Sequence, residues 1–152
     1  MPSADNSPRQ THAGIDPRGP RVGAVVTSLL LASVLVLGDR AAGRALLAFV
    51  VALFVAGAAL GPARSPLGLV FRHLVAPHLT PASEREDPRP PRFAQVVGLL
   101  VTASGLGLAL LGVPMALTVG AALALAAAFL NAAFGVCLGC ELYLLGTRLR
   151  RA

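Results

Sequence analysis

Four long apolar blocks constrain the fold of this chain more than any other feature. They cover residues 22–38, 45–61, 93–112 and 115–146, and the first three contain no charged residue. A helix needs about 20 apolar residues to cross a hydrocarbon core of about 30 Å. The first two blocks therefore need flanking residues to complete a span, whereas the fourth is too long for one straight span. We expect the fourth span to end just before Gly135, which loosens or bends the helix.

The connections between these blocks alternate in length. The loop at residues 39–44 and the turn at residues 112–114 are short, but the middle connection at residues 62–92 is long. Short loops join helices that pack as antiparallel neighbours. The pattern therefore predicts an all-α membrane protein with four transmembrane helices, arranged as two helical hairpins joined by a linker.

A short amphipathic stretch follows each hairpin. After the second span, apolar residues recur at helical spacing, and they are Leu67, Val70, Phe71, Leu74 and Val75. After the fourth span, the leucines expected to face lipid are Leu138, Leu142, Leu145 and Leu149. Helices of this kind lie along a membrane surface. We therefore expect a short interfacial helix after the second span and another after the fourth.

The chain also contains an internal repeat. The sequence DPRGPR begins at Asp16 and DPRPPR begins at Asp87, 71 positions later. Each copy is followed by two apolar blocks, and an even number of spans makes the copies parallel. We therefore divide the chain into a disordered polar tail (1–14), a first repeat (15–75), a linker (76–86) and a second repeat (87–152). We expect the prolines of each motif to delay the start of the helix that follows.

The arginines predict the orientation in the membrane. All 13 basic residues are arginine, and only Arg40 and Arg44 lie in the loop between the first two spans. The others precede the first span, lie in the middle connection or follow the fourth span. Cytoplasmic loops carry an excess of basic residues. The pattern therefore predicts a protein of the bacterial inner membrane with both termini and the middle connection in the cytoplasm.

The two cysteines form one CxxC sequence, Cys137 to Cys140. On a helix these positions share a face, with Cα atoms about 5–6 Å apart, within the range for a disulfide. Nearby arginines would favour the reactive thiolate. Glu141 and the C-terminal end of a helix would oppose it, so the net effect on the thiols stays open. The alternative is that both cysteines are small apolar residues at a helix contact.

Several other polar residues are candidates for the same site. The arginines of the two DPRxPR motifs are predicted to bind lipid phosphate or another anion, and they are Arg18, Arg21, Arg89 and Arg92. Glu141 would modulate the thiols or form an ion pair with one of these arginines. Asn131 is expected to hydrogen-bond between helices.

Metal binding is a further alternative. A closed zinc site needs four ligands, and Cys137, Cys140, His73 and His78 are the candidates. We expect His73 and His78 to lie on the same face of the membrane as the cysteines. A solvated or interfacial side chain is the ordinary role for each histidine.

Other function classes are excluded or unsupported. The net charge of +6 does not indicate nucleic acid binding, because the arginines flank apolar blocks. There is no nucleotide-binding loop, no Ser/His/Asp set and no HExxH motif, so nothing indicates a hydrolase. The sequence identifies no cofactor. The lipid bilayer is the expected partner, and a homo-oligomer is compatible with the sequence.

Four stretches of the chain resemble a bacterial membrane family. IDPRGPR, LGPARSPLGLVFRHLV, EDPRPPRFAQ and LNAAFGVCLGCELYLL are similar to the family catalogued as domain of unknown function 4395. The resemblance runs from Ile15 to Leu145. It implies a small multi-pass inner-membrane protein with a terminal CLGC element, and it implies no established activity.

Our leading hypothesis is a thiol–disulfide or sulfur-relay component of the membrane, in which Cys137 and Cys140 are the exchanging pair. A soluble thioredoxin-like or rhodanese-like partner would supply electrons or sulfane sulfur. A metal-handling protein for zinc or copper is the second hypothesis. A non-catalytic structural or lipid-anchoring subunit is the third.

Overall fold

The computed structural model of the protein describes residues 14–152. The predicted polar tail, apart from Gly14, lies outside these residues. Four long helices dominate, namely α1 (Arg18–Leu37), α2 (Ala41–Leu60), α4 (Arg89–Leu110) and α5 (Ala116–Phe134). Each is long and apolar enough to cross a membrane, which confirms the prediction of four spans.

The DPRxPR motifs lie at the starts of α1 and α4. The helices begin at Arg18 and Arg89, so Pro20, Pro90 and Pro91 lie within the first turn. Pro17 and Pro88 are the N-cap residues directly before these helices, which is consistent with prolines that keep a helix from starting early. The first N–H groups of a helix have no intrahelical acceptor, so proline is tolerated there.

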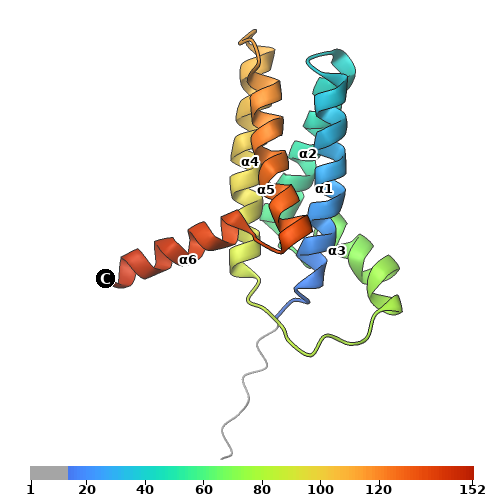
Figure 1. The fold of residues 1–152 in the computed structure, drawn as a ribbon, viewed down its shortest axis with the longest axis vertical. Helices are drawn as coiled ribbons and strands as arrows, with labels where there is room; N and C mark the ends of the chain where they lie inside the picture. The colour runs from blue at the N-terminus through green and yellow to red at the C-terminus, as the bar shows by residue number, and fades with distance from the viewer. Residues whose placement is uncertain (1–13) are drawn as a thin grey trace, which may run out of the picture.

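The four long helices pack into one bundle (Figure 1). Helix α1 contacts α5 and α2, and α4 contacts α5 and α2. The largest fully buried side chains lie in the interior of the bundle, namely Leu31, Val34, Leu47, Val50, Thr102 and Leu117. Helices α4 and α5 approach closely, because a Cβ atom at Gly105 would lie 3.0 Å from Gly120 Cα. Small residues at a helix crossing are typical of packing in membranes.

A chain of short helical segments follows α2. These segments are α3 (Pro66–Val70), the π-helical η1 (Phe71–Val75) and the 3-10 segment η2 (Ala76–His78). We expected one amphipathic helix here, and the structure divides it into three. Pro77 is one reason, because it has no N–H to donate to an earlier carbonyl group. Phe71 is buried, with its ring against Gly19 of α1.

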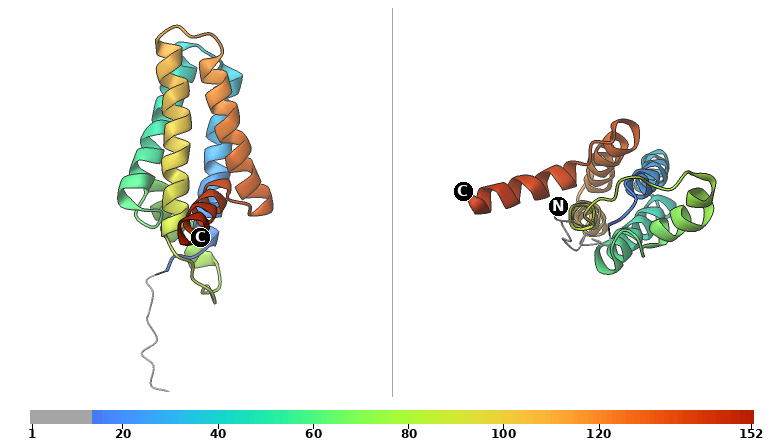
Figure 2. Two further views of the ribbon diagram at one scale, coloured as in Figure 1. Left: turned by 90° about the vertical axis from the view of Figure 1, so that its left-hand side faces the viewer. Right: turned by 90° about the horizontal axis from the view of Figure 1, so that it is seen from below.

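Helix α6 (Leu138–Arg151) follows α5 and extends away from the bundle. Figure 2 shows it on the opposite side of the bundle from α3 and η1. The leucines predicted to face lipid are exposed, namely Leu138, Leu142, Leu145 and Leu149. A helix is therefore present after the fourth span, as predicted.

The two DPRxPR motifs lie side by side at the end of the bundle from which α6 leaves. Ile15 and Glu86, which precede the motifs, form an isolated antiparallel β-bridge. Each donates its N–H to the carbonyl oxygen of the other at 3.0 Å. This bridge brings segments 71 positions apart in the sequence to the same end of the bundle.

Candidate disulfide site

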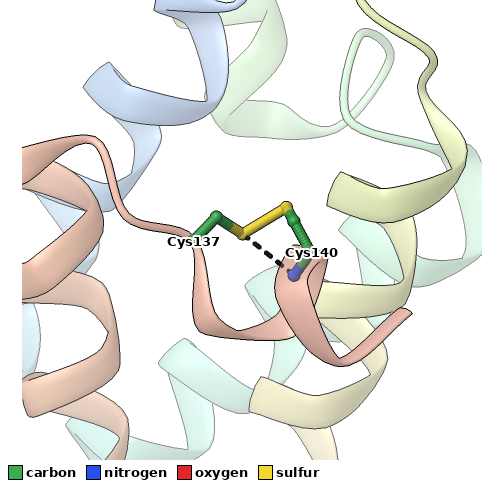
Figure 3. The surroundings of a disulfide bond; sticks show 2 residues. All are labelled: Cys137 and Cys140. Atoms are coloured by element: carbon green, nitrogen blue, oxygen red, sulfur yellow. Dashed lines mark hydrogen bonds between the residues drawn. A yellow bond between two sulfur atoms is a disulfide. The ribbon is translucent and has the colours of Figure 1, made fainter. Parts of the chain in front are cut away.

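Cys137 and Cys140 form a disulfide bond at the start of α6. Their Cα atoms are 5.2 Å apart, and both residues are half-buried. Figure 3 shows the bond spanning the first turn of this helix. Because only two residues separate the cysteines, the bond constrains one turn and joins no second helix.

The disulfide lies at the beginning of a helix, and the expected helix C-terminus around it is wrong. Helix α5 ends at Phe134, and Gly135 has a φ of 69° and donates its N–H to Asn131 O. A glycine in this left-handed conformation commonly ends a helix. The chain then starts α6 with Cys137 as the N-cap. A helix N-terminus carries partial positive charge, so the charge beside Cys137 Sγ is opposite in sign to that of the expected helix C-terminus.

The sulfur of Cys137 caps α6. Its Sγ atom accepts a hydrogen bond from the N–H of Cys140 at 3.4 Å (Figure 3). Cys137 has an extended backbone, whereas Cys140 lies inside the first helical turn. The expectation that both cysteines lie on one helix is therefore wrong for Cys137. A sulfur atom is a weak acceptor, and its negatively charged form is a stronger one.

Close packing holds the CLGC turn against α4. Gly139 is buried, and a Cβ atom there would lie 2.5 Å from Ala94 Cα. One turn further on, the rings of Tyr143 and Phe93 lie 5.7 Å apart. These contacts give the disulfide a defined position relative to the bundle.

The disulfide borders a pocket of about 560 Å³ that has charged residues in its lining. Both DPRxPR motifs contribute to this outer pocket, together with the end of α5 and the start of α6. Its charged lining residues are Arg18, Arg21, Glu86, Asp87 and Glu141. Asn131, Cys137 and Cys140 also line it. The structure therefore brings five of the predicted site residues together at one pocket, namely Arg18, Arg21, Cys137, Cys140 and Glu141.

Two of the predicted anion-binding arginines bind helix ends. Arg21 donates from Nε to Ala132 O at 3.1 Å and from an Nη atom to Ala133 O at 3.2 Å. Arg92 makes the same pair of bonds to the last turn of α2, at 2.7 Å and 3.0 Å, and its acceptors are Ala58 O and Ala59 O. A cation at a helix C-terminus is favourable because the last carbonyl groups carry partial negative charge.

The aspartates of the two motifs hold the helix starts. Asp16 accepts from the backbone N–H of Arg18, and Asp87 accepts from that of Arg89, both at 2.9 Å. Arg18 also donates through its guanidinium group to Asp16. This hydrogen bond lowers the pKa of the Asp16 carboxyl group below its ordinary value.

The remaining candidates are not assembled as ion pairs or metal ligands. Within residues 14–152, Glu141 forms no ion pair, so its expected pairing with a motif arginine is absent. His73 lies in η1 and His78 in η2, on the opposite side of the bundle from α6 (Figure 2). The described residues contain no group of three or more His, Cys, Asp or Glu side chains placed to hold a metal ion. The expected four-ligand set is not assembled here.

Two further polar residues line the pockets near the cysteines, and neither of them was assigned to this place from the sequence. Asn131 was expected to bond between helices, but within residues 14–152 the side-chain hydrogen bonds between the long helices come from Arg21 and Arg92, and Asn131 lines the outer pocket. Gln95 was not considered, although it lines a second cavity beside the cysteines. The signal that could have found it is a lone amide inside an apolar block.

The four spans and the cysteine pair define a multi-pass α-helical membrane protein with a disulfide at one end of its bundle. The chain belongs to the family described as Domain of unknown function (DUF4395), whose family model matches residues 15–148. The resemblance inferred from the sequence is therefore confirmed. No curated protein and no solved structure matches the chain.

Proposed function

We propose that this protein exchanges thiols and disulfides at the surface of the membrane, with Cys137 and Cys140 as the reacting pair. One observation carries the proposal. The bonded sulfur atoms lie at a helix N-terminus and line a pocket that contains Arg18 and Arg21 together with three acidic residues. Low-pKa, accessible cysteines of exchange proteins often lie at helix N-termini.

The geometry supports different roles for the two sulfur atoms. A thiolate of a soluble dithiol partner attacks Cys140 Sγ, the bond between the cysteines breaks, and Cys137 leaves as a thiolate. Cys137 is the better leaving group because it accepts the Cys140 N–H and caps the helix. The second thiolate of the partner then attacks the mixed disulfide. The partner becomes a disulfide, and the pair becomes a dithiol that has gained two electrons and two protons.

A thioredoxin-like domain is the partner class that fits this reaction, since it presents a dithiol. Transfer of sulfane sulfur from a rhodanese-like partner is the other variant of the hypothesis. A pair that is already disulfide-bonded supports this variant less than it supports thiol–disulfide exchange. His73 and His78 do not lie with the cysteines, so metal handling is supported less well than exchange.

We further propose that this end of the bundle faces the cytoplasm and that the two halves are parallel repeats. The arginine distribution supports the orientation. The matched bonds of Arg21 and Arg92, and the mutual bridge of Ile15 and Glu86, support the repeat. A membrane-impermeant maleimide tests the orientation. After reduction, it should label Cys140 in inverted membrane vesicles and not in intact cells.

A single-turnover assay tests the exchange reaction. The purified full-length protein is mixed with a molar excess of reduced thioredoxin without any other electron acceptor. We expect one thioredoxin disulfide to form per protein molecule, with both cysteines becoming reactive to a maleimide-linked polymer. The variant Cys137→Ser/Cys140→Ser is the control and should form none. An unreactive disulfide in the folded wild-type protein would sink the proposal.

A further inference from the structure

A second cavity lies between the helices of the bundle and is bordered by Cys137 of the disulfide. This inner cavity has a volume of about 230 Å³ and is lined by α1, α2, α4, α5 and the start of α6. Its lining contains no charged residue, and its polar side chains are those of Thr27, Gln95, Asn131 and Cys137. An uncharged cavity among membrane spans is accessible to molecules that dissolve in lipid.

The inner cavity and the outer pocket meet at the disulfide. Pro20, Pro91, Asn131 and Cys137 line both of them. Of the two cysteines, Cys140 lines the outer pocket, and Cys137 lines the inner cavity as well. Cys137 therefore borders both spaces, and Cys140 borders the outer pocket.

Two amide groups in the inner cavity are available to a ligand. Asn131 and Gln95 line this cavity, and within residues 14–152 no buried side-chain polar atom lacks a hydrogen-bond partner, so their amide atoms are either bonded or accessible. Both residues are half-buried, and Gln95 Oε1 lies against Gly57 of α2. Because a polar group in an apolar site gains most from a partner, these amides suit a ligand that carries carbonyl oxygens. A ligand that consists only of a hydrocarbon chain would give these amide groups no hydrogen-bond partner.

The volume restricts the size of the occupant. Cavities for drug-sized ligands measure about 300–1,000 Å³, and the inner cavity is smaller, at about 230 Å³. It suits a single substituted ring, with any long apolar tail placed outside among the lipids.

We propose that the inner cavity binds the ring of a membrane quinone, which reoxidises the cysteine pair; this inference rests on the proposed exchange function. The Cys137 thiolate adds to a ring carbon of the quinone, and a C–S bond forms. The Cys140 thiolate then attacks Cys137 Sγ, so the S–S bond forms and the C–S bond breaks. The ring leaves as a quinol with the two electrons and two protons of the dithiol. The amide groups of Asn131 and Gln95 donate hydrogen bonds to the two quinone oxygens.

Continuous turnover tests this inference. The full-length protein in detergent receives excess reduced thioredoxin and decylubiquinone, and quinone reduction is followed by absorbance. We expect many turnovers, against one without quinone. The variant Ala128→Phe, which fills the inner cavity, should lower the rate at least tenfold while retaining the single turnover. Ala126→Phe on the exposed face of α5 is the matched control and should keep the wild-type rate.

The amide groups have their own test. Gln95→Leu should raise the KM for decylubiquinone several-fold and leave the single turnover unchanged, because Gln95 lines the inner cavity and is not among the lining residues of the outer pocket. Asn131→Leu should raise the same KM. If single turnover occurs but quinone brings no further oxidation, or if a phospholipid chain occupies the cavity and quinone does not displace it, the quinone site is refuted and the exchange function stands. If the single turnover itself is absent, the exchange function fails, and the quinone inference falls with it.

Discussion

The two halves of the bundle start their terminal helices with the same cap built from different atoms. In the first half, Ser65 Oγ caps α3 and accepts the N–H of Gly68 at 3.1 Å. In the second half, Cys137 Sγ caps α6 and accepts the N–H of Cys140 at 3.4 Å. Serine is the common residue for this purpose, so the cap alone does not call for cysteine. The two caps therefore share one hydrogen-bond pattern, and the second also contains a disulfide between Cys137 and Cys140.

The loops before the two caps differ in length. Three residues separate Gly61 from Ser65 in the first half, whereas only Val136 separates Gly135 from Cys137 in the second. The longer loop packs against α3, because a Cβ atom at Gly68 would collide with the carbonyl oxygen of Pro62. In the second half, Gly139 packs against Ala94 of α4 instead.

The largest expected effect comes from giving the second half the residues of the first. The variant Cys137→Ser/Cys140→Gly should lose thiol–disulfide exchange completely, because no sulfur atom remains. Its thermal unfolding in detergent should stay close to that of the wild type, because serine caps α6 as Ser65 caps α3. A variant that fails to fold would show that the disulfide is mainly structural.

The next largest effect concerns the glycines of the two turns. Gly68→Ala should destabilise the first half, and Gly139→Ala should displace α6 from Ala94, each by about 1–3 kcal/mol, the usual range for overpacking. Gly146→Ala is the control, because a Cβ atom there meets nothing within 4 Å. Chemical denaturation in detergent measures all three. An equal, negligible effect for the three would contradict the close packing described for the turns.

A smaller effect is expected from the two arginines that bind helix ends. Arg21→Ala and Arg92→Ala should each lower the free energy of unfolding by about 1 kcal/mol, as a cation at a helix C-terminus does. Because each makes two bonds to the other half, the two values should agree. Thermal unfolding of the single variants tests this, and clearly different values would show that the two halves are held unequally.

The smallest effect is a pH dependence confined to the first half. The Arg18 hydrogen bond lowers the pKa of Asp16 in the folded protein, so its stabilising contribution is complete at neutral pH. It is lost as the pH falls through that lowered pKa, below the ordinary range of an aspartate. The stability difference between wild type and Asp16→Asn should therefore shrink between pH 5 and about pH 2. Arg89→Gln is a control with no ion pair to lose among the described residues.

Much of the architecture could be predicted because hydropathy acts locally. Blocks of about 20 apolar residues must become helices in a bilayer, since no other conformation satisfies their backbone groups. The four spans and the break at Gly135 follow from that rule. The parallel arrangement of two hairpins remains a prediction.

The direction of the helix at the cysteines could not be predicted from spacing. Cys137 and Cys140 occupy positions that suit either the end of α5 or the start of α6, and the two choices place opposite partial charges beside the sulfur atoms. Gly135 decides between them by ending α5 with a positive φ. The role of Arg21 was equally hidden, because its acceptor Ala132 O lies 111 positions away.

The amino-acid sequence by itself determined the number of spans, the basic end of the bundle and the family, because these depend on residues that are neighbours along the chain. Only the tertiary structure decided that Cys137 caps a helix, that Glu141 has no ion pair within the described residues, and that a cavity reaches the disulfide from inside the bundle. These features depend on which helices meet, and contacts between distant segments leave no periodic trace in a single sequence.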